Sequence, residues 1–202
     1  MKTFVLKTLF SGLSAIIFMI TPVGQVVFGA TCNMFSHPDS AYIFAYSPAR
    51  SNGNNGLHIA WSVDKENWHA IGSNHSFVRS DYSRWGAEKR MINPYLFRDI
   101  DGLWHCVWTL NERVGAFAHA ASRDLIYWIA QSYPLVMADG NCIMPVIARY
   151  GTDGKYAVAW NNDRDGTNQS FYATTKDFKT YAPTNATDAN TFADMRREVF
   201  VA

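Results

Sequence analysis

The 202-residue chain carries little charge, and what it carries is balanced. Charged residues make up 17% of it, and 18 Lys and Arg against 17 Asp and Glu leave a formal net charge of +1. It has no basic run or stripe, so nucleic-acid binding and attachment to anionic lipid have no electrostatic support. Apolar residues make up 48% of the sequence, which argues against disorder. We therefore expect a folded domain whose partner is not nucleic acid.

Cysteine is also scarce, with Cys32, Cys106 and Cys142 the three in the chain. None stands in a C-x-x-C spacing or near a histidine in a zinc pattern, so we expect no metal and no cofactor. Export into an oxidising space would permit a disulfide between Cys106 and Cys142. The alternative, which we favour, is two buried free thiols.

Long apolar runs are confined to the N-terminus. Lys2 and Lys7 flank its start, residues 9–20 are mostly apolar, and Gly29 and Ala30 offer a small-residue cleavage site. This pattern predicts a signal peptide over residues 1–30, a linker over residues 31–40 and a domain over residues 41–202. The domain would then be exported, to the periplasm, the cell surface or the medium. A retained membrane anchor is the alternative.

Cys32 follows the predicted cleavage site directly and raises a lipid anchor as a further alternative. However, Thr31 stands where a lipobox requires Gly, Ala or Ser.

No long helical period follows residue 30; instead, strand-like segments repeat. The clearest repeat is LHIAWSVDKENW (57–68), AFAHAASRDLIYW (116–128) and SFYATTKDFKTY (170–181). In each, an alternating apolar strand reaches Ser or Thr, then an aspartate, then an aromatic residue four positions later. The aspartates are Asp64, Asp124 and Asp177. Because they recur in every copy, they suit a structural role better than a catalytic one.

Two further elements repeat in the same order. One is AYIFAYS (41–47), GLWHCVWTLN (102–111) and GKYAVAWNN (154–162); the other is NPYLFRDIDG and MPVIARYGTDG, whose Pro94 and Pro145 are 51 positions apart. A period of about 50 residues in an all-β chain is typical of a propeller blade, a four-stranded meander. We therefore predict an all-β, incomplete β-propeller of about three blades. Since closure needs roughly four blades, we expect a truncated product or gene fragment, or a chain that pairs with another.

Residues 103–110 alternate with period 2, and both alternating sets are largely apolar. This pattern predicts a strand covered on both faces by neighbouring blades.

A resemblance to a known family is carried by three segments, NPYLFRDIDGLWHCVWTL, HAASRDLIYWIAQSYPLV and NCIMPVIARYGTDGKYAVAW. Through them the chain resembles glycoside hydrolase family 43 over roughly residues 40–182. The similarity is to its arabinosidase- and xylosidase-type five-bladed propellers. It implies hydrolysis of arabinose- or xylose-containing polysaccharides by three acids at the mouth of the central channel. These are a general base, a general acid and an aspartate that positions the acid.

The sequence departs from this pattern at two of the expected acids. Asn93 stands before Pro94 where the resemblance implies aspartate, and Val146 stands where it implies an acidic residue after Pro145. Asn cannot accept a proton at neutral pH, although it can still hydrogen-bond a sugar hydroxyl. A non-catalytic carbohydrate-binding propeller and an inactive fragment are therefore alternatives to a hydrolase.

The remaining candidate catalytic and sugar-binding residues are chosen by their positions relative to the repeats. Asp81 and Glu88, in the unrepeated segment before Ile92, are the best candidates for catalytic carboxylates. The candidates for contact with an oligo- or polysaccharide are Asn93, Trp85, Trp108, His119, Trp160 and Asn161. Trp108 and Trp160 match each other in two blades, so core packing is the alternative for both. For His119 the alternative is a buried, hydrogen-bonded histidine.

Overall fold

The structure, a computed structural model, describes residues 41–48, 56–73, 75–83, 89–164, 166 and 168–187. The predicted signal peptide and linker, together with Cys32, Trp85 and Glu88, lie outside the described residues.

The described residues form ten strands and no helix. The strands are β1 (Tyr42–Tyr46), β2 (His58–Ser62), β3 (His69–Ala70), β4 (Ile92–Arg98), β5 (Trp104–Thr109), β6 (Phe117–Ser122), β7 (Ile143–Tyr150), β8 (Lys155–Asn162), β9 (Gln169–Thr175) and β10 (Asn185–Thr187). They pair in three antiparallel sheets, β1-β2-β3, β4-β5-β6 and β7-β8-β9-β10, each a meander of consecutive strands.

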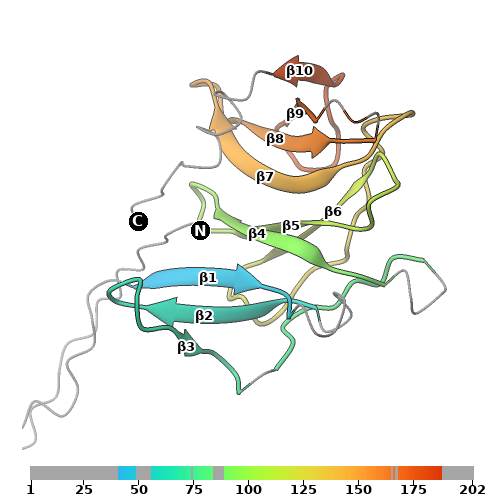
Figure 1. Ribbon diagram of the computed structural model, residues 1–202. Coiled ribbons are helices and arrows are strands. Elements are labelled where there is room, and N and C mark those ends of the chain that lie inside the picture. The colour runs from blue at the N-terminus through green and yellow to red at the C-terminus, as the bar shows by residue number, and fades with distance from the viewer. Residues whose placement is uncertain are drawn as a thin grey trace, which may run out of the picture.

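The three sheets are stacked, with β4–β6 in the middle (Figure 1). Strand β4 lies against β7 on one side and against β1 on the other. Radially stacked antiparallel meanders are the arrangement of propeller blades. The prediction of an all-β, partial propeller with about three blades is confirmed.

The strands follow the repeats in the sequence. Strands β1, β5 and β8 form one matching set, and β2, β6 and β9 form another. Beside β6, the isolated bridges Ala116–Leu135, His119–Ser132 and Ser122–Trp128 take the place that β3 and β10 hold beside β2 and β9. The second and third sheets therefore share one strand order, and the described part of the first sheet matches it except for a counterpart of β4 and β7.

Strand β5 is buried on both faces, as its alternation predicts. Trp104, Cys106 and Trp108 pack in a cluster with Ile43, Leu57 and Ile59 of the first sheet. Val107 packs in a second cluster with Phe97 and Phe117 of its own sheet and Ile147, Val158 and Trp160 of the third. We call these two clusters the first and second seams between sheets, and they contain most of the buried apolar residues. Burying side chains of this size contributes about 1.5–3 kcal/mol each.

Cys106 and Cys142 are both buried free thiols, which confirms the favoured alternative. They belong to different seams, Cys106 to the first and Cys142 to the second. Burial raises the pKa of both thiols well above the usual range, so neither is suited to be a nucleophile.

Asp64, Asp124 and Asp177 build the same turn in each blade. In the third blade, the Asp177 Oδ1 accepts the backbone N–H groups of Lys179 and Thr180, both at 2.9 Å. The Thr175 Oγ1 accepts the N–H of Phe178 at 2.9 Å, and Phe178 has a positive φ of 55°. The hydrogen bonds to the Asp177 carboxylate, first that from the Thr180 N–H and then that from the Lys179 N–H, lower its pKa to about 2. The recurring aspartates are turn formers.

Candidate functional site

Strands β4 and β7 begin in the same unusual way. Asn93 and Met144 each precede a proline and have positive φ values of 49° and 53°. At each position the register with the next strand shifts, between Ile92 and Tyr95 in β4 and between Ile143 and Val146 in β7. A non-glycine residue in this backbone region costs of order 1–3 kcal/mol and persists only where the surroundings enforce it. Such bulges re-aim side chains, often beside functional sites.

The start of β7 is joined to the end of β5, the strand that pairs with the start of β4. The backbone N–H of Met144 donates to the Thr109 Oγ1 at 2.9 Å, and Thr109 is the register partner of Ile92 in β4. Farther along the strands, the Tyr95 hydroxyl donates to the Ile147 carbonyl at 3.3 Å. Both strands therefore start at one end of the stack. We call Asn93, Thr109, Met144 and Asn161 the axial cluster.

Neutral polar groups dominate this cluster. Asn93 is exposed, and its amide offers two donors and one acceptor oxygen. Asn161 is half-buried beside Ile143, its register partner, and its Oδ1 accepts the Ser170 hydroxyl at 2.9 Å. Amides and hydroxyls suit the donors and acceptors of an uncharged polyol, but they cannot exchange protons with it at neutral pH.

Val146 lies in an apolar environment. It is 1% exposed, opposite Ala159, and Tyr95 and Tyr172 pack against the two. An unpaired carboxylate would be costly in this environment. The valine therefore fits its surroundings, and the acid that the resemblance implies is absent from this position.

Asn141 makes a second set of polar contacts, between loops of the second and third sheets. The Asn141 Nδ2 donates to the Asp163 Oδ1 at 2.7 Å and to the Glu112 carbonyl at 2.9 Å. In return, the Asn141 Oδ1 accepts the backbone N–H of Asp163 at 3.0 Å. This network joins the loops after β5 and β8 to the segment that leads into β7.

Sequence reasoning missed both Thr109 and Asn141. For Thr109 a signal existed, since it stands in the repeated strand end VWTLN, which matches AWNN. For Asn141 no repeated pattern pointed to the loop contact.

Asp81 lies in the connection after β3 and contacts Gln131 and Tyr133, on either side of the residue bridged to β6. Its carboxylate is exposed and accepts a hydrogen bond from the Tyr133 hydroxyl. Its backbone N–H donates to the Gln131 Oε1 at 3.1 Å. The other two candidates from this segment, Trp85 and Glu88, lie outside the described residues.

Trp108 and Trp160 have no exposed surface. Trp108 packs in the first seam and Trp160 in the second, where its Nε1 donates to the Met137 Sδ at 3.2 Å. Their positions favour the core-packing alternative over direct contact with a sugar.

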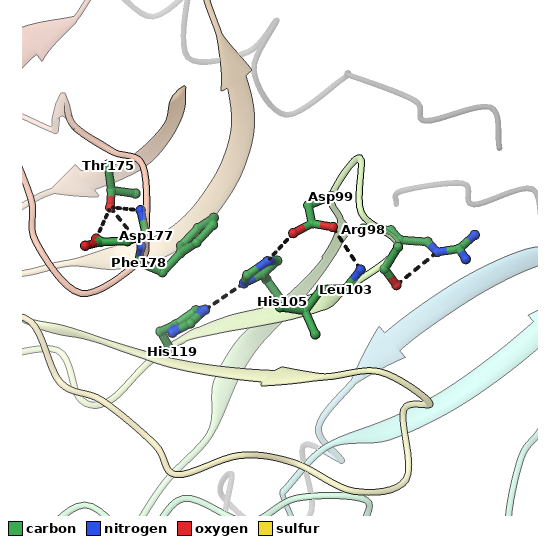
Figure 2. A network of polar contacts seen from close by, with 9 residues as sticks. Arg98, Asp99, Leu103, His105, His119, Thr175, Asp177 and Phe178 are labelled. Carbon is green, nitrogen blue, oxygen red and sulfur yellow. Dashed lines mark hydrogen bonds and ion pairs between the residues drawn. The ribbon is translucent and has the colours of Figure 1, made fainter. Parts of the chain in front are cut away.

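His119 is a buried, hydrogen-bonded histidine, and it lies in a chain of polar contacts rather than in the axial cluster (Figure 2). Its Nε2 is 2.9 Å from the Nδ1 of His105, whose Nε2 is 3.2 Å from the Asp99 Oδ2. Burial, followed by the nearby His105, lowers the pKa of His119 to about 3. The ring is therefore neutral at pH 7.

In the part of the chain that the structure describes, no three His, Cys, Asp or Glu side chains gather as they would to hold a metal ion. The same residues contain no helix long and apolar enough to cross a membrane.

Comparison with known proteins shows the fold and nothing finer. No family model and no curated protein matches the sequence. Among solved structures, the chain is similar to a mutant α-L-arabinofuranosidase from Fusarium graminearum in complex with an iminosugar inhibitor, with a TM-score of 0.51 and 19% identity over 74% of this chain. It is also similar to a glycoside hydrolase family 43 arabinoxylan arabinofuranohydrolase from Bacillus subtilis in complex with cellotetraose, with a TM-score of 0.50 and 12% identity over 73% of this chain.

The chain spans 45% of the Fusarium enzyme and 33% of the Bacillus enzyme. It therefore has the fold of part of a glycoside hydrolase β-propeller.

Proposed function

We propose that the chain is a glycoside hydrolase-like protein of the family 43 type that recognises arabinose- or xylose-containing oligo- or polysaccharides at the axial cluster. Two lines support the proposal: the likeness in fold to two glycoside hydrolases, and the motifs that resemble family 43. Because similarity at this level of identity carries fold alone, the assignment of function depends on the cluster itself.

The observation that carries the proposal is the matched start of β4 and β7. Two strained residues, Asn93 and Met144, occur at equivalent points of two blades, and the hydroxyl of Thr109, the residue paired with Ile92, accepts the Met144 N–H. The exposed one carries an amide, which can donate to and accept from adjacent sugar hydroxyls. Strained backbone of this kind clusters at ligand sites.

Binding without turnover is the form of this function that the described residues favour. Inverting hydrolysis needs one carboxylic acid and one carboxylate on opposite sides of the sugar. Asn93 and Val146 stand where the resemblance implies two of these acids, and neither can move a proton. Loss of one such group typically costs about 10²–10⁴-fold in rate.

Hydrolysis is the second candidate function, and Asp81 is the observation that favours it. Its carboxylate is exposed, and the Tyr133 hydroxyl fixes its orientation. Asp81 begins the segment that leads from the first sheet to β4, the same segment that contains Glu88.

Calorimetric titration of the full chain with arabinoxylan oligosaccharides tests recognition. The wild type should bind, Asn93→Ala should weaken binding about tenfold or more, and His75→Gln, at an exposed position away from the cluster, should leave it unchanged. Loss of one or two good hydrogen bonds to a sugar supports that magnitude. Equal affinity for the wild type and Asn93→Ala would remove the cluster from the proposal.

Assays with aryl arabinofuranosides and aryl xylosides separate binding from turnover. Hydrolysis that is abolished by Asp81→Asn or Glu88→Gln, while Asn93→Ala retains it, would establish the second candidate. No hydrolysis by a chain that binds the oligosaccharide is the result expected of a binding propeller.

Export of the domain is also a proposal, supported by the apolar segment before residue 30. A secreted product that begins at residue 31 or 32 on intact-mass analysis supports it. A mass retaining the first 30 residues contradicts it, and an added lipid mass on Cys32 would identify an anchor.

A further inference from the structure

Four polar side chains of the second sheet and its connections form a continuous chain away from the axial cluster, and Figure 2 shows three of them, Asp99, His105 and His119. The Asp99 Oδ2 is 3.2 Å from the His105 Nε2, and the His105 Nδ1 is 2.9 Å from the His119 Nε2. The His119 Nδ1 is 3.4 Å from the Ser132 hydroxyl. We call these four side chains the relay. His105 and His119 are 3% and 6% exposed, so the two rings have little contact with water.

With both rings neutral, one arrangement of protons satisfies every contact. The Asp99 carboxylate can only accept, so the His105 Nε2 carries the proton and donates it to Asp99. The His105 Nδ1 is then an acceptor, and the His119 Nε2–H donates to it. The His119 Nδ1 in turn accepts from the Ser132 hydroxyl. All three donors therefore point toward Asp99.

The relay lies in the seam between the second and third sheets. Phe178, from the turn after β9, stacks on both imidazoles, with ring centroids 4.0 Å from His105 and 5.0 Å from His119. The turn holds Phe178 through the hydrogen bond from its backbone N–H to the Thr175 Oγ1 at 2.9 Å. The flat contact of one Phe ring with two neutral imidazoles joins the sheets at this point.

Few ionisable groups face the pair. Asp99 approaches from the turn after β4, and its side chain is 10% exposed. Tyr156 on β8 faces His105 with ring centroids 6.4 Å apart. Phe97 of β4, Ser132 and Phe178 complete the surroundings and carry no charge. Among the described residues, Asp99 is therefore the one anion that contacts either imidazole and could stabilise its positive form.

Extra protons disturb this arrangement in two steps. A first proton can make His105 cationic beside Asp99, provided that the His119 tautomer reverses and its Nδ1–H donates to Ser132. A second proton leaves no acceptor between the rings, because the His105 Nδ1–H and the His119 Nε2–H would face each other at the distance of a hydrogen bond. Two adjacent buried cations repel each other strongly.

We propose that the relay is an acid-sensitive joint, which holds the second and third sheets together while both histidines are neutral and loosens the seam when they take up protons. Burial lowers the pKa of His105 and of His119, and Asp99 opposes the shift at His105 only in part. A histidine whose pKa is lower in the folded than in the unfolded chain contributes its full stability at pH values above 6.5, the ordinary pKa of histidine. That contribution is lost as the pH falls below 6.5, because the unfolded chain then binds more protons than the folded one.

The unfolding equilibrium constant of the full chain, measured in denaturant from pH 7 to pH 5, tests the joint. Each histidine that is neutral in the folded chain raises this constant by up to roughly tenfold per pH unit below 6.5. In His119→Gln the side-chain amide can still donate to the His105 Nδ1 but cannot titrate. Its acid dependence should therefore be shallower than that of the wild type by about one proton, whereas His75→Gln should match the wild type. Equal acid dependence in all three proteins overturns the proposal.

A second measurement uses the wild-type protein and does not depend on whether His119→Gln folds. Imidazole ¹⁵N shifts of the wild-type protein at pH 7 should show both rings neutral, with the proton on Nε2 of each. A cationic ring at pH 7, or an Nδ1–H tautomer of either histidine, contradicts the proposal.

Discussion

Thr109, at the end of β5, joins the second sheet to the start of β7 through a single hydroxyl. The side chain is 1% exposed, and its Oγ1 accepts the backbone N–H of Met144 at 2.9 Å. A buried N–H that loses its acceptor is left unsatisfied, which costs about 1–3 kcal/mol. The strained start of β7 therefore depends on a residue of the neighbouring sheet.

Replacing Thr109 by Val should accordingly lower the free energy of unfolding by about 1–3 kcal/mol, since shape is kept and the acceptor is lost. Thr109→Ser keeps the hydroxyl and should retain more of the stability. Urea unfolding of the three proteins measures the difference. Equal losses in the two variants would mean that packing of the methyl group, and not the hydrogen bond, is what matters.

Asp177 should show its role in acid. Its carboxyl has a pKa lowered from 3.8 to about 2, so its contribution to stability is complete above about 3.8 and is lost as the pH falls toward 2. Asp177→Asn keeps an oxygen acceptor and should lose this part of the acid dependence. Asp177→Ala loses the acceptor as well and should melt a few degrees lower even at pH 7. Melting curves from pH 7 to pH 2 distinguish these outcomes, and an alanine variant identical to the wild type at every pH would contradict them.

At the level of strands, the repeats in the sequence were the strongest guide. They predicted the order of strands and the recurring turn, because each blade repeats the same local hydrogen bonds. The two buried faces of β5 also followed from sequence, since both alternating sets of residues 103–110 are largely apolar. These features depend on neighbours within one blade or on simple burial.

The bulges and the relay could not be predicted in the same way. A proline after Asn93 or Met144 favours extended backbone, yet both residues adopt positive φ at the points where the register with the next strand shifts. The contact between His105 and His119 depends on the register of β5 with β6, which sequence alone does not fix. Likewise, Trp108 and Trp160 fit both a sugar-binding and a core role until their burial is known.

Gly115 marks a close approach between two connections of the second sheet. A Cβ on this residue would overlap the carbonyl oxygen of Met137, and the Gly115 carbonyl accepts the backbone N–H of Met137 at 3.0 Å. Gly115→Ala should therefore lower the melting temperature by several degrees. Gly154→Asn is the matched control, because no atom lies within 4 Å of a Cβ there and Asn tolerates its φ of 70°. A neutral Gly115→Ala would show that the two connections can separate without cost.

The three sheets should unfold together, because each seam is shared by two of them. Phe97 has no exposed surface and packs in the second seam, so Phe97→Ala should cost about 3–5 kcal/mol. Ile126 is 60% exposed, and Ile126→Ala should change the stability by no more than about 0.5 kcal/mol. Chemical denaturation followed by Trp fluorescence and by far-UV circular dichroism measures both. Separate transitions in the two signals would contradict cooperative stacking of the blades.

Carbohydrate recognition by the axial cluster requires that a sugar bind there. Amide chemical-shift mapping of the full chain, titrated with an arabinoxylan oligosaccharide, locates the site. We predict saturable shifts at Asn93, Thr109, Met144 and Asn161, with Asn93→Ala reducing them. Saturable shifts confined to other surfaces, or no shifts at any concentration of oligosaccharide, would contradict carbohydrate recognition by the axial cluster.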